Sequence, residues 1–518
     1  MANSVFNLSN LNGTNGFVLN GIAAGDVSGR SVSSAGDVNG DGIDDLIIGA
    51  FGADPNGNSS SGQSYVVFGK STPFSPALNL STLNGTNGFA INGINAFDFS
   101  GRSVSSAGDV NGDGIDDLII GAAYANPNGF SSGQSYVVFG NSIGFSATLN
   151  LSTLNGTNGF AINGFNAFDF SGRSVSSAGD INGDGIDDLI IGARDADPNG
   201  TDSGQSYVVF GNSTGFSATL NLSTLNGTNG FVLNGIAAGD ASGYSVSSAG
   251  DINGDGIDDL IIGARGASPN GLYSGQSYVV FGNSTGFSAT LNLSTLNGTN
   301  GFILNGIAAG DVSGNSVSSA GDVNGDGIDD LIIGAYLADP NGNLSGQSYV
   351  VFGNSTGFSA TLDLSTLNGT SGFAINGIAE RDLSGYSVSS AGDVNGDGID
   401  DLIIGGFGAS PNGSQSGRSY VVFGKSTGFS ATLDLSTLNG TNGFILNGIA
   451  VGDVSGNSVS SAGDVNGDGI DDLIIGARLA SPNGSSSGQS YVVFGNRAPI
   501  FDLNGTNGLG IDFSTTFT

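Results

Sequence analysis

The sequence contains no cysteine, no histidine and no tryptophan, and only 11 of its 518 residues are lysine or arginine. Without cysteine no disulfide can hold the fold, so a buried core and bound metal are left to stabilise it. Histidine and cysteine are also frequent catalytic bases, nucleophiles and zinc ligands, so their absence narrows the possible chemistry. The scarcity of cations argues against nucleic acid as a partner, because phosphate binding depends on basic patches.

Long hydrophobic runs are missing as well. No hydrophobic segment of the sequence is long enough to span a membrane. The first residues, 1–8, lack the basic and apolar stretches of a secretory signal. The sequence therefore predicts no transmembrane segment.

What the sequence has instead is one acidic loop repeated seven times at a spacing of 71 or 72 residues. The first copy covers residues 37–45, and the others cover 109–117, 180–188, 251–259, 322–330, 393–401 and 464–472. Four aspartates in each copy make up 28 of the 45 acidic residues, so the net charge of −34 is concentrated in these loops. A period near 71 suits one four-stranded propeller blade, and such a unit is too small to bury its own sheet faces alone.

Each repeat carries four short runs rich in β-branched and aromatic residues, with Gly, Asn, Ser or Pro between them. In the first repeat they cover 17–20, 31–35, 45–48 and 64–68. Such runs are typical of antiparallel strands, and no window has the period of a helix. The pattern predicts an all-β, seven-bladed β-propeller of four-stranded antiparallel blades. Because the chain starts with an outer strand, we expect that N-terminal strand to complete the last blade and close the ring.

The repeats predict one propeller domain over residues 1–496. The tail, 497–518, copies the linker between repeats once more, followed by a degraded outer strand. It either packs beside the ring closure or starts a further, truncated domain, and we favour the second interpretation.

The segment 28–50 resembles the FG-GAP repeat, which builds the seven-bladed propeller of integrin α subunits and of many bacterial surface proteins. The match recurs in all seven repeats. Two features depart from the family pattern: Ser28 stands where the Phe of the Phe-Gly pair is expected, and Phe51 replaces the Pro of Gly-Ala-Pro. The resemblance implies the propeller fold and calcium more strongly than it implies integrin-like partners.

The acidic loops have the composition of a cation site. Oxygen-bearing side chains at loop positions 1, 3, 5 and 9, with Gly at position 6, suit a hard cation. An EF-hand would need Glu at position 12, which is Ile48, so Asp45 is the expected last ligand. Calcium fits better than magnesium because an all-protein oxygen cage suits its looser coordination. Asp44 is expected to face solvent, and the resemblance adds the backbone carbonyl of Ile43 as a ligand.

We expect about seven structural Ca²⁺ ions, and the alternative is that the loops are acidic turns without metal. The candidate ligands, one set per repeat, are Asp37, Asn39, Asp41, Ile43 and Asp45; Asp109, Asn111, Asp113, Ile115 and Asp117; Asp180, Asn182, Asp184, Ile186 and Asp188; Asp251, Asn253, Asp255, Ile257 and Asp259; Asp322, Asn324, Asp326, Ile328 and Asp330; Asp393, Asn395, Asp397, Ile399 and Asp401; Asp464, Asn466, Asp468, Ile470 and Asp472.

The near-identical repeats differ mainly after Ser-Gly and after Gly-Ala, where Arg, Tyr and Phe are frequent. Such residues carry binding energy at interfaces. The strand order puts both places on one face of the ring and the acidic loops on the other. The alternative is drift at exposed loop tips. The candidate ligand-binding residues are Arg30, Arg102, Arg173, Tyr244, Tyr386, Phe51, Tyr124, Arg194, Arg265, Tyr336, Phe407 and Arg478.

The leading hypothesis is a calcium-stabilised, extracellular or cell-surface propeller that binds a protein or glycan ligand through the face opposite the calcium loops. We expect it to be monomeric within a larger protein and not an enzyme. One alternative is a passive spacer or surface-layer module. A less favoured one is a hydrolase or lyase, for which Glu380, the single glutamate of the chain, is the candidate.

Overall fold

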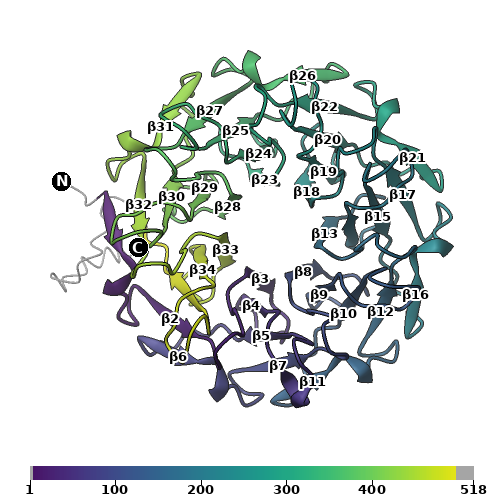
Figure 1. Ribbon diagram of the computed structural model, residues 1–518, viewed down its shortest axis with the longest axis vertical. Coiled ribbons are helices and arrows are strands. Elements are labelled where there is room, and N and C mark those ends of the chain that lie inside the picture. The colour runs from purple at the N-terminus through teal and green to yellow at the C-terminus, as the bar shows by residue number, and fades with distance from the viewer. Residues whose placement is uncertain (1–3, 498–518) are drawn as a thin grey trace, which may run out of the picture.

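The strands form over the four predicted runs of each repeat and assemble into a closed ring of seven sheets (Figure 1). The computed structural model describes residues 4–497. In the first repeat the runs become β2 (Gly16–Asn20), β3 (Ser31–Gly36), β4 (Asp45–Ala50) and β5 (Gln63–Val67). The predicted seven-bladed propeller is confirmed.

Each sheet is one blade, numbered here from the blade that starts with β3, and its strands are given from the ring centre outwards. Blade 1 contains β3, β4, β5, β7 (Gly88–Asn92) and β11 (Thr148–Asn150); blade 2 contains β8 (Ser103–Gly108), β9 (Asp117–Ala122), β10 (Gln134–Val138), β12 (Gly159–Asn163) and β16 (Thr219–Asn221); blade 3 contains β13 (Ser174–Gly179), β14 (Asp188–Ala193), β15 (Gln205–Val209), β17 (Gly230–Asn234) and β21 (Thr290–Asn292). Blade 4 contains β18 (Ser245–Gly250), β19 (Asp259–Ala264), β20 (Gln276–Val280), β22 (Gly301–Asn305) and β26 (Thr361–Asp363); blade 5 contains β23 (Ser316–Gly321), β24 (Asp330–Ala335), β25 (Gln347–Val351), β27 (Gly372–Asn376) and β31 (Thr432–Asp434). Blade 6 contains β28 (Ser387–Gly392), β29 (Asp401–Gly406), β30 (Arg418–Val422), β32 (Gly443–Asn447) and β1 (Val5–Asn7); blade 7 contains β33 (Ser458–Gly463), β34 (Asp472–Ala477), β35 (Gln489–Val493), β2 and β6 (Ala77–Asn79).

The prediction of four strands per blade is wrong, because every blade has a fifth, short strand at its outer edge. In blade 7 this strand is β6, which pairs in parallel with β2 in the register Val18↔Ala77. Each linker thus adds an edge strand to the preceding blade before it supplies the fourth strand of its own blade. A three-residue strand has almost no sequence signal of its own, since pairing with an existing edge forms it.

The only helices in residues 4–497 are three-residue 3₁₀ turns, most of them directly after a fifth strand. They are η1 (Leu8–Asn10), η2 (Pro55–Gly57), η3 (Leu80–Thr82), η4 (Leu151–Thr153), η5 (Leu222–Thr224), η6 (Leu293–Thr295), η7 (Leu364–Thr366) and η8 (Leu435–Thr437). Among the residues that the structure describes, no helix has the length and apolar character needed to cross a membrane.

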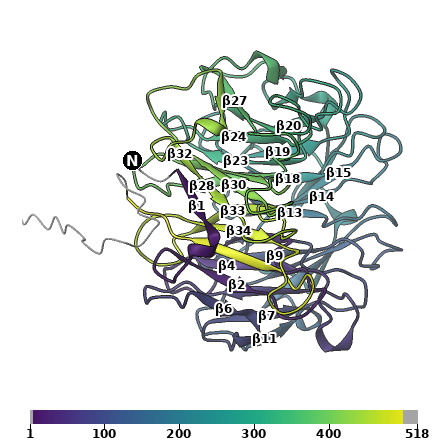
Figure 2. The same ribbon diagram turned by 60° about the vertical axis from the view of Figure 1, so that its left-hand side comes forward.

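The N-terminal segment closes the ring, as predicted, and it does so twice. Strand β2 pairs antiparallel with β35 of blade 7 in the register Phe17↔Val492, and β1 pairs in parallel with β32 of blade 6 in the register Val5↔Ile445. The purple N-terminal strands accordingly lie among the yellow and green strands of these blades in Figures 1 and 2. Residues 498–518, most of the predicted tail, lie outside the described residues, so the domain division stays a prediction.

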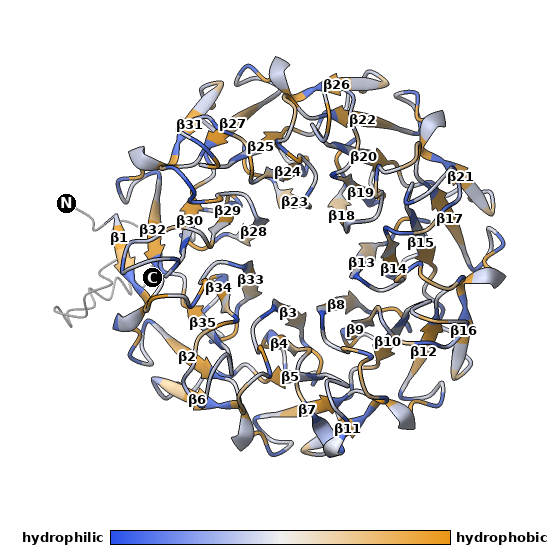
Figure 3. Ribbon diagram, viewed as in Figure 1, coloured by the Kyte–Doolittle hydropathy of each residue, from blue (hydrophilic) through white to orange (hydrophobic). Residues whose placement is uncertain are grey.

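The core lies between neighbouring blades. Strand β4 is buried along its whole length, with Leu46, Ile47 and Ile48 at most 1% exposed, as its two apolar faces predict. The hydrophobic colour in Figure 3 is concentrated in the middle strands of each blade. Neighbouring inner strands are also joined by hydrogen bonds around the ring centre: the backbone N–H of Val104 donates to the Ser31 hydroxyl over 3.1 Å, and Val32 donates to Ser458 at the junction of blades 7 and 1.

Candidate functional site

The antiparallel pairing of β3 with β4 separates the two candidate sites. Ser31 pairs with Gly49 and Gly36 pairs with Asp45, so the loop at 37–44 closes one end of the blade while residues 30 and 51 leave from the other. The same register recurs in every blade. The ring therefore has an acidic face, formed by the seven acidic loops, and a variable face, formed by the residues that differ between repeats.

The shape of each acidic loop is set by its own aspartates. The Asp37 carboxylate accepts the backbone N–H groups of Asp41, over 3.0 Å, and Gly42, over 2.7 Å. Asp41 in turn accepts the N–H of Ile43 over 3.1 Å. These bonds hold a turn with three carboxylates on a short stretch of chain.

Asp45 begins β4 and is completely buried. Its carboxylate accepts N–H groups from Gly69 over 2.9 Å and Val38 over 3.2 Å, and the Asn39 amide donates to both of its oxygens. Burial raises the pKa of Asp45 to about 8, the Gly69 bond lowers it, and the negative charges of Asp41 and Asp37 raise it further. An ionised Asp45 at neutral pH therefore calls for a positive charge, and within residues 4–497 no ion pair supplies one.

The prediction that Asp44 faces solvent is wrong, because this position joins neighbouring blades. The Asp116 carboxylate of blade 2 accepts the backbone N–H of Asp37 in blade 1 over 2.9 Å. Asp44 makes the same bond, over 2.8 Å, to Asp464 where blade 1 meets blade 7. The Asp116 carboxylate packs directly over Gly36, whose φ of +69° and missing side chain make room for it. Each acidic loop is thus tied to the next one around the ring.

The predicted calcium ligands of each set lie in one loop and at the start of the strand after it, but they do not form a closed cage. Within residues 4–497, no group of three or more carboxylates is gathered closely enough to hold a metal ion. The Asn39 amide nitrogen faces Asp45, although a ligand would present its oxygen. In blade 6, however, the buried Asn395 oxygen has no hydrogen-bond partner. Carboxylate and amide oxygens without a soft donor match Ca²⁺ in kind, and the ligand assignment stays a prediction.

The predicted ligand-binding residues meet around the ring centre on the variable face. The Arg102 guanidinium lies 5.5 Å from the Phe51 ring and 5.8 Å from the Tyr124 ring. Arg265 lies 3.8 Å from the ring of Tyr244. We call the twelve predicted residues the arginine–aromatic ring. They are half-buried, which the alternative of exposed loop tips does not predict.

Aromatic pairs continue this ring through blades 5 and 6. Tyr386 makes edge contacts with Tyr336, at 5.2 Å between centroids, and with Phe407, at 4.6 Å. Across the junction of blades 7 and 1, Arg30 donates to Asn457 over 3.2 Å. The contacts of Tyr386 with Tyr336 and of Arg30 with Asn457 join adjacent repeats, so the packing of blades helps to assemble the ring.

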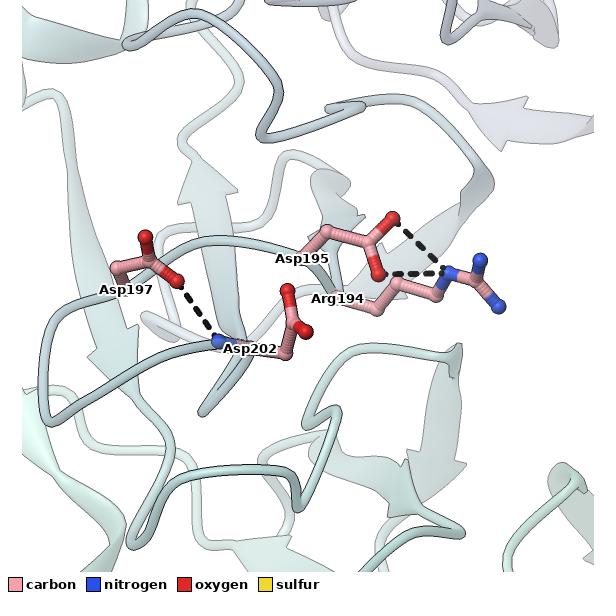
Figure 4. Close-up of polar contacts among 4 residues, drawn as sticks. All are labelled: Arg194, Asp195, Asp197 and Asp202. Atoms are coloured by element: carbon pink, nitrogen blue, oxygen red, sulfur yellow. Dashed lines mark hydrogen bonds and ion pairs between the residues drawn. The ribbon is translucent and has the colours of Figure 1, made fainter.

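The arginine–aromatic ring contains six arginines and no acidic residue. Burial lowers the pKa of Arg102 to about 10, and the charges of Arg173 and Arg30 lower it further. Burial also lowers the pKa of Arg478. Arg194 is the compensated member, because Asp195 lies 3.2 Å from its guanidinium (Figure 4). In the described part of the chain, Arg102 and Arg173 have no carboxylate partner.

A second aromatic group, which is absent from the residues predicted above, lies beside this ring. The blade 2–3 phenylalanine patch consists of Phe97, Phe99, Phe130, Phe168 and Phe170. Phe97 and Phe168 are 61% and 57% exposed and have φ of 66° and 70°. Four sister repeats have glycine at this position, namely Gly25, Gly239, Gly310 and Gly452. Comparing the repeats at this position would have revealed the patch.

The enzyme candidate Glu380 lies on the surface. Its side chain is 62% exposed and lies 3.7 Å from the guanidinium of Arg381, which is 75% exposed. A surface ion pair of this kind contributes little free energy and encloses no substrate.

Comparisons with known proteins agree with the geometry. A family model described as "FG-GAP repeat" matches residues 28–67, 100–138, 171–209, 242–280, 313–351, 384–422 and 455–493. The chain is 28% identical over 338 residues to a phosphatidylinositol-glycan-specific phospholipase D of Dictyostelium discoideum, covering 62% of this chain and 33% of that protein. It is 30% identical over 253 residues to integrin alpha pat-2 of Caenorhabditis elegans, covering 46% and 18%. It is 28% identical over 260 residues to integrin alpha-V of Gallus gallus, covering 48% and 21%. The matches therefore span a third or less of these relatives.

Proposed function

Because the chain belongs to the FG-GAP repeat family, as the sequence predicts, we propose that it is a calcium-stabilised propeller that binds a protein or glycan ligand through its variable face. The observation that carries the proposal is the arginine–aromatic ring. The repeats are otherwise nearly identical, yet the residues that differ converge on one surface and are of the types that dominate binding interfaces.

The calcium part of the proposal rests on the acidic loops. Asp37, Asn39, Asp41 and Asp45 would hold the ion, which supplies the positive charge that a buried, ionised Asp45 lacks. Turning over the Asn39 amide would direct its oxygen into the loop. Weak sites of this kind are filled at extracellular calcium concentrations, which is why we propose that the protein works outside the cell or at its surface.

The binding part rests on chemistry as well as on position. Half-buried arginines next to aromatic rings are held in place and remain able to donate hydrogen bonds. Absence of histidine and cysteine and the exposed position of Glu380 favour binding over catalysis. One relative is named as a phospholipase, but this chain matches only 33% of it, so its activity is not part of the proposal.

The test is a binding screen with charge-matched variants. The calcium-loaded full chain is immobilised and presented with acidic and neutral oligosaccharides and with purified matrix proteins. Replacing Arg30, Arg102 and Arg173 by asparagine should remove the captured ligand without lowering the melting temperature. Replacing Lys70, Arg381 and Lys425, which lie outside the ring, removes the same charge and should leave capture unchanged. Ligand capture that is unchanged when Arg30, Arg102 and Arg173 are replaced would refute the proposal. Calcium-dependent self-association without any ligand would refute it in favour of a spacer.

A further inference from the structure

The blade 2–3 phenylalanine patch is an apolar surface next to the arginine–aromatic ring. Phe99 contacts the rings of Phe51, at 5.9 Å between centroids, and Tyr124, at 5.2 Å. Phe170 contacts Tyr124 from the other side at 5.2 Å. Through Phe99 and Phe170 the patch therefore adjoins the ring over blades 1 to 3.

Its outer members are exposed and gain little from the fold. Phe97 contacts Phe99 at 6.4 Å, and Phe168 contacts Phe130 at 5.4 Å, yet Phe130 itself is 67% exposed. A bulky side chain at positive φ is strained relative to glycine. The sister repeats form the same turn with glycine, so folding does not require phenylalanine here. Exposed apolar surface of this kind marks an interaction site.

Cationic donors border the patch. Arg102 lies over Phe51 and Tyr124, and Arg173 lies 5.9 Å from the Tyr244 ring. Neither has a carboxylate partner within residues 4–497. Asp98 and Asp169, which follow Phe97 and Phe168 in the sequence, are at most 5% exposed. The acidic loops lie on the opposite face, where salt screens them from the patch, because the Debye length is about 8 Å at physiological ionic strength.

We propose that this surface docks an acidic protein segment with apolar side chains, whose carboxylates pair with Arg102 and Arg173 while its apolar side chains cover Phe97 and Phe168. This rests on the proposed function and names the ligand class. Guanidinium groups pair with carboxylates through two parallel hydrogen bonds. Phenylalanine offers no hydroxyl or N–H to a sugar, so the patch favours a protein segment over a glycan.

The sister repeats supply variants that keep the fold. Phe97→Gly with Phe168→Gly installs the glycine of four other blades, and Arg102→Asn with Arg173→Asn installs the residue of blades 5 and 7, Asn315 and Asn457. The glycine pair relieves positive φ, so its melting temperature should equal or exceed that of the unchanged protein. A loss of binding in that pair therefore cannot be attributed to unfolding.

The probe is a fluorescent peptide of alternating aspartate and leucine, with the full calcium-loaded chain as receptor. Binding should weaken about tenfold in each double variant, since aromatic and arginine anchors dominate interfaces. Binding of a control peptide with serine in place of leucine should be unchanged by Phe97→Gly with Phe168→Gly. It should still be weakened by Arg102→Asn with Arg173→Asn. Raising the salt concentration should weaken binding of both peptides.

Three results would overturn the inference. The first is no binding of the aspartate–leucine peptide. The second is equal binding by all variants. The third is stronger binding of an oligogalacturonate, lost only with the arginines, which would make the ligand an acidic glycan. If a ligand from the screen above is lost when Arg30, Arg102 and Arg173 are replaced but is still bound by the Phe97→Gly, Phe168→Gly variant, the proposed function stands and this inference fails.

Discussion

Removing the charge of Asp45 should change how the stability of the metal-free protein depends on pH. The unfolded chain ionises this carboxyl near the ordinary aspartate pKa of 3.8, whereas burial in the folded protein raises the pKa to about 8. Between these values the folded state keeps a proton that the unfolded state has lost. Its stability therefore falls as the pH rises through this window.

The size of the effect follows from the shift. One retained proton gives a slope of about 1.4 kcal/mol per pH unit. From about pH 5 to about pH 7, one loop should thus remove ~2.7 kcal/mol of unfolding free energy. Asp45→Asn removes the ionisable group, while its amide oxygen can still accept the Gly69 N–H and the Asn39 amide can turn over to accept from it.

The assay compares urea unfolding of chelator-treated wild type and the Asp45→Asn variant at both pH values. The variant should lose less stability on going to the higher pH, by about 2–3 kcal/mol. Saturating calcium should flatten the pH dependence of the wild type. It should also make the wild type more stable than the variant, because the variant lacks a ligand. Equal pH dependence in metal-free wild type and variant would refute the buried-carboxyl reasoning.

Two further predictions concern the contacts between blades. Asp116→Ala leaves the Asp37 N–H without its acceptor and should lower the free energy of unfolding by about 1–3 kcal/mol. Asp44→Ala should lower it by as much, since the junction of blades 7 and 1 has the same bond; a much smaller loss for Asp44→Ala in urea unfolding would show that this junction is built differently. Deleting residues 1–20 removes β1 and β2 and uncovers the edges of β32 and β35, so light scattering should detect self-association, and a monomer of unchanged stability would contradict the closure.

The repeat made most of the fold predictable. Four strand runs per repeat and an N-terminal outer strand sufficed for seven blades and for closure by β2. Antiparallel pairing alone places residues 30 and 51 opposite the acidic loop. What the repeat could not predict arises between blades. The β6-type edge strand and the bond from Asp116 to Asp37 depend on a neighbour 58 or more residues away in sequence, which no local pattern encodes.

The repeats also made part of the candidate site predictable. Variation among the repeats after Ser-Gly and after Gly-Ala predicts the arginine–aromatic ring. Phe97 and Phe168 differ from their sister residues just as clearly, and their exposure became apparent only with the turn that holds them at positive φ. Residue identity predicts the ring and marks Phe97 and Phe168 as exceptions among the repeats, whereas the exposure of these two side chains follows from the backbone geometry.

The most direct test of a calcium-stabilised propeller is a calcium titration of chelator-treated protein by calorimetry, with thermal unfolding followed in parallel. We expect about seven bound ions and a large rise in melting temperature, since each site filled to a hundredfold excess over its dissociation constant adds roughly 2.7 kcal/mol. Absence of binding, or binding without stabilisation, would reduce the loops to acidic turns and contradict the proposal.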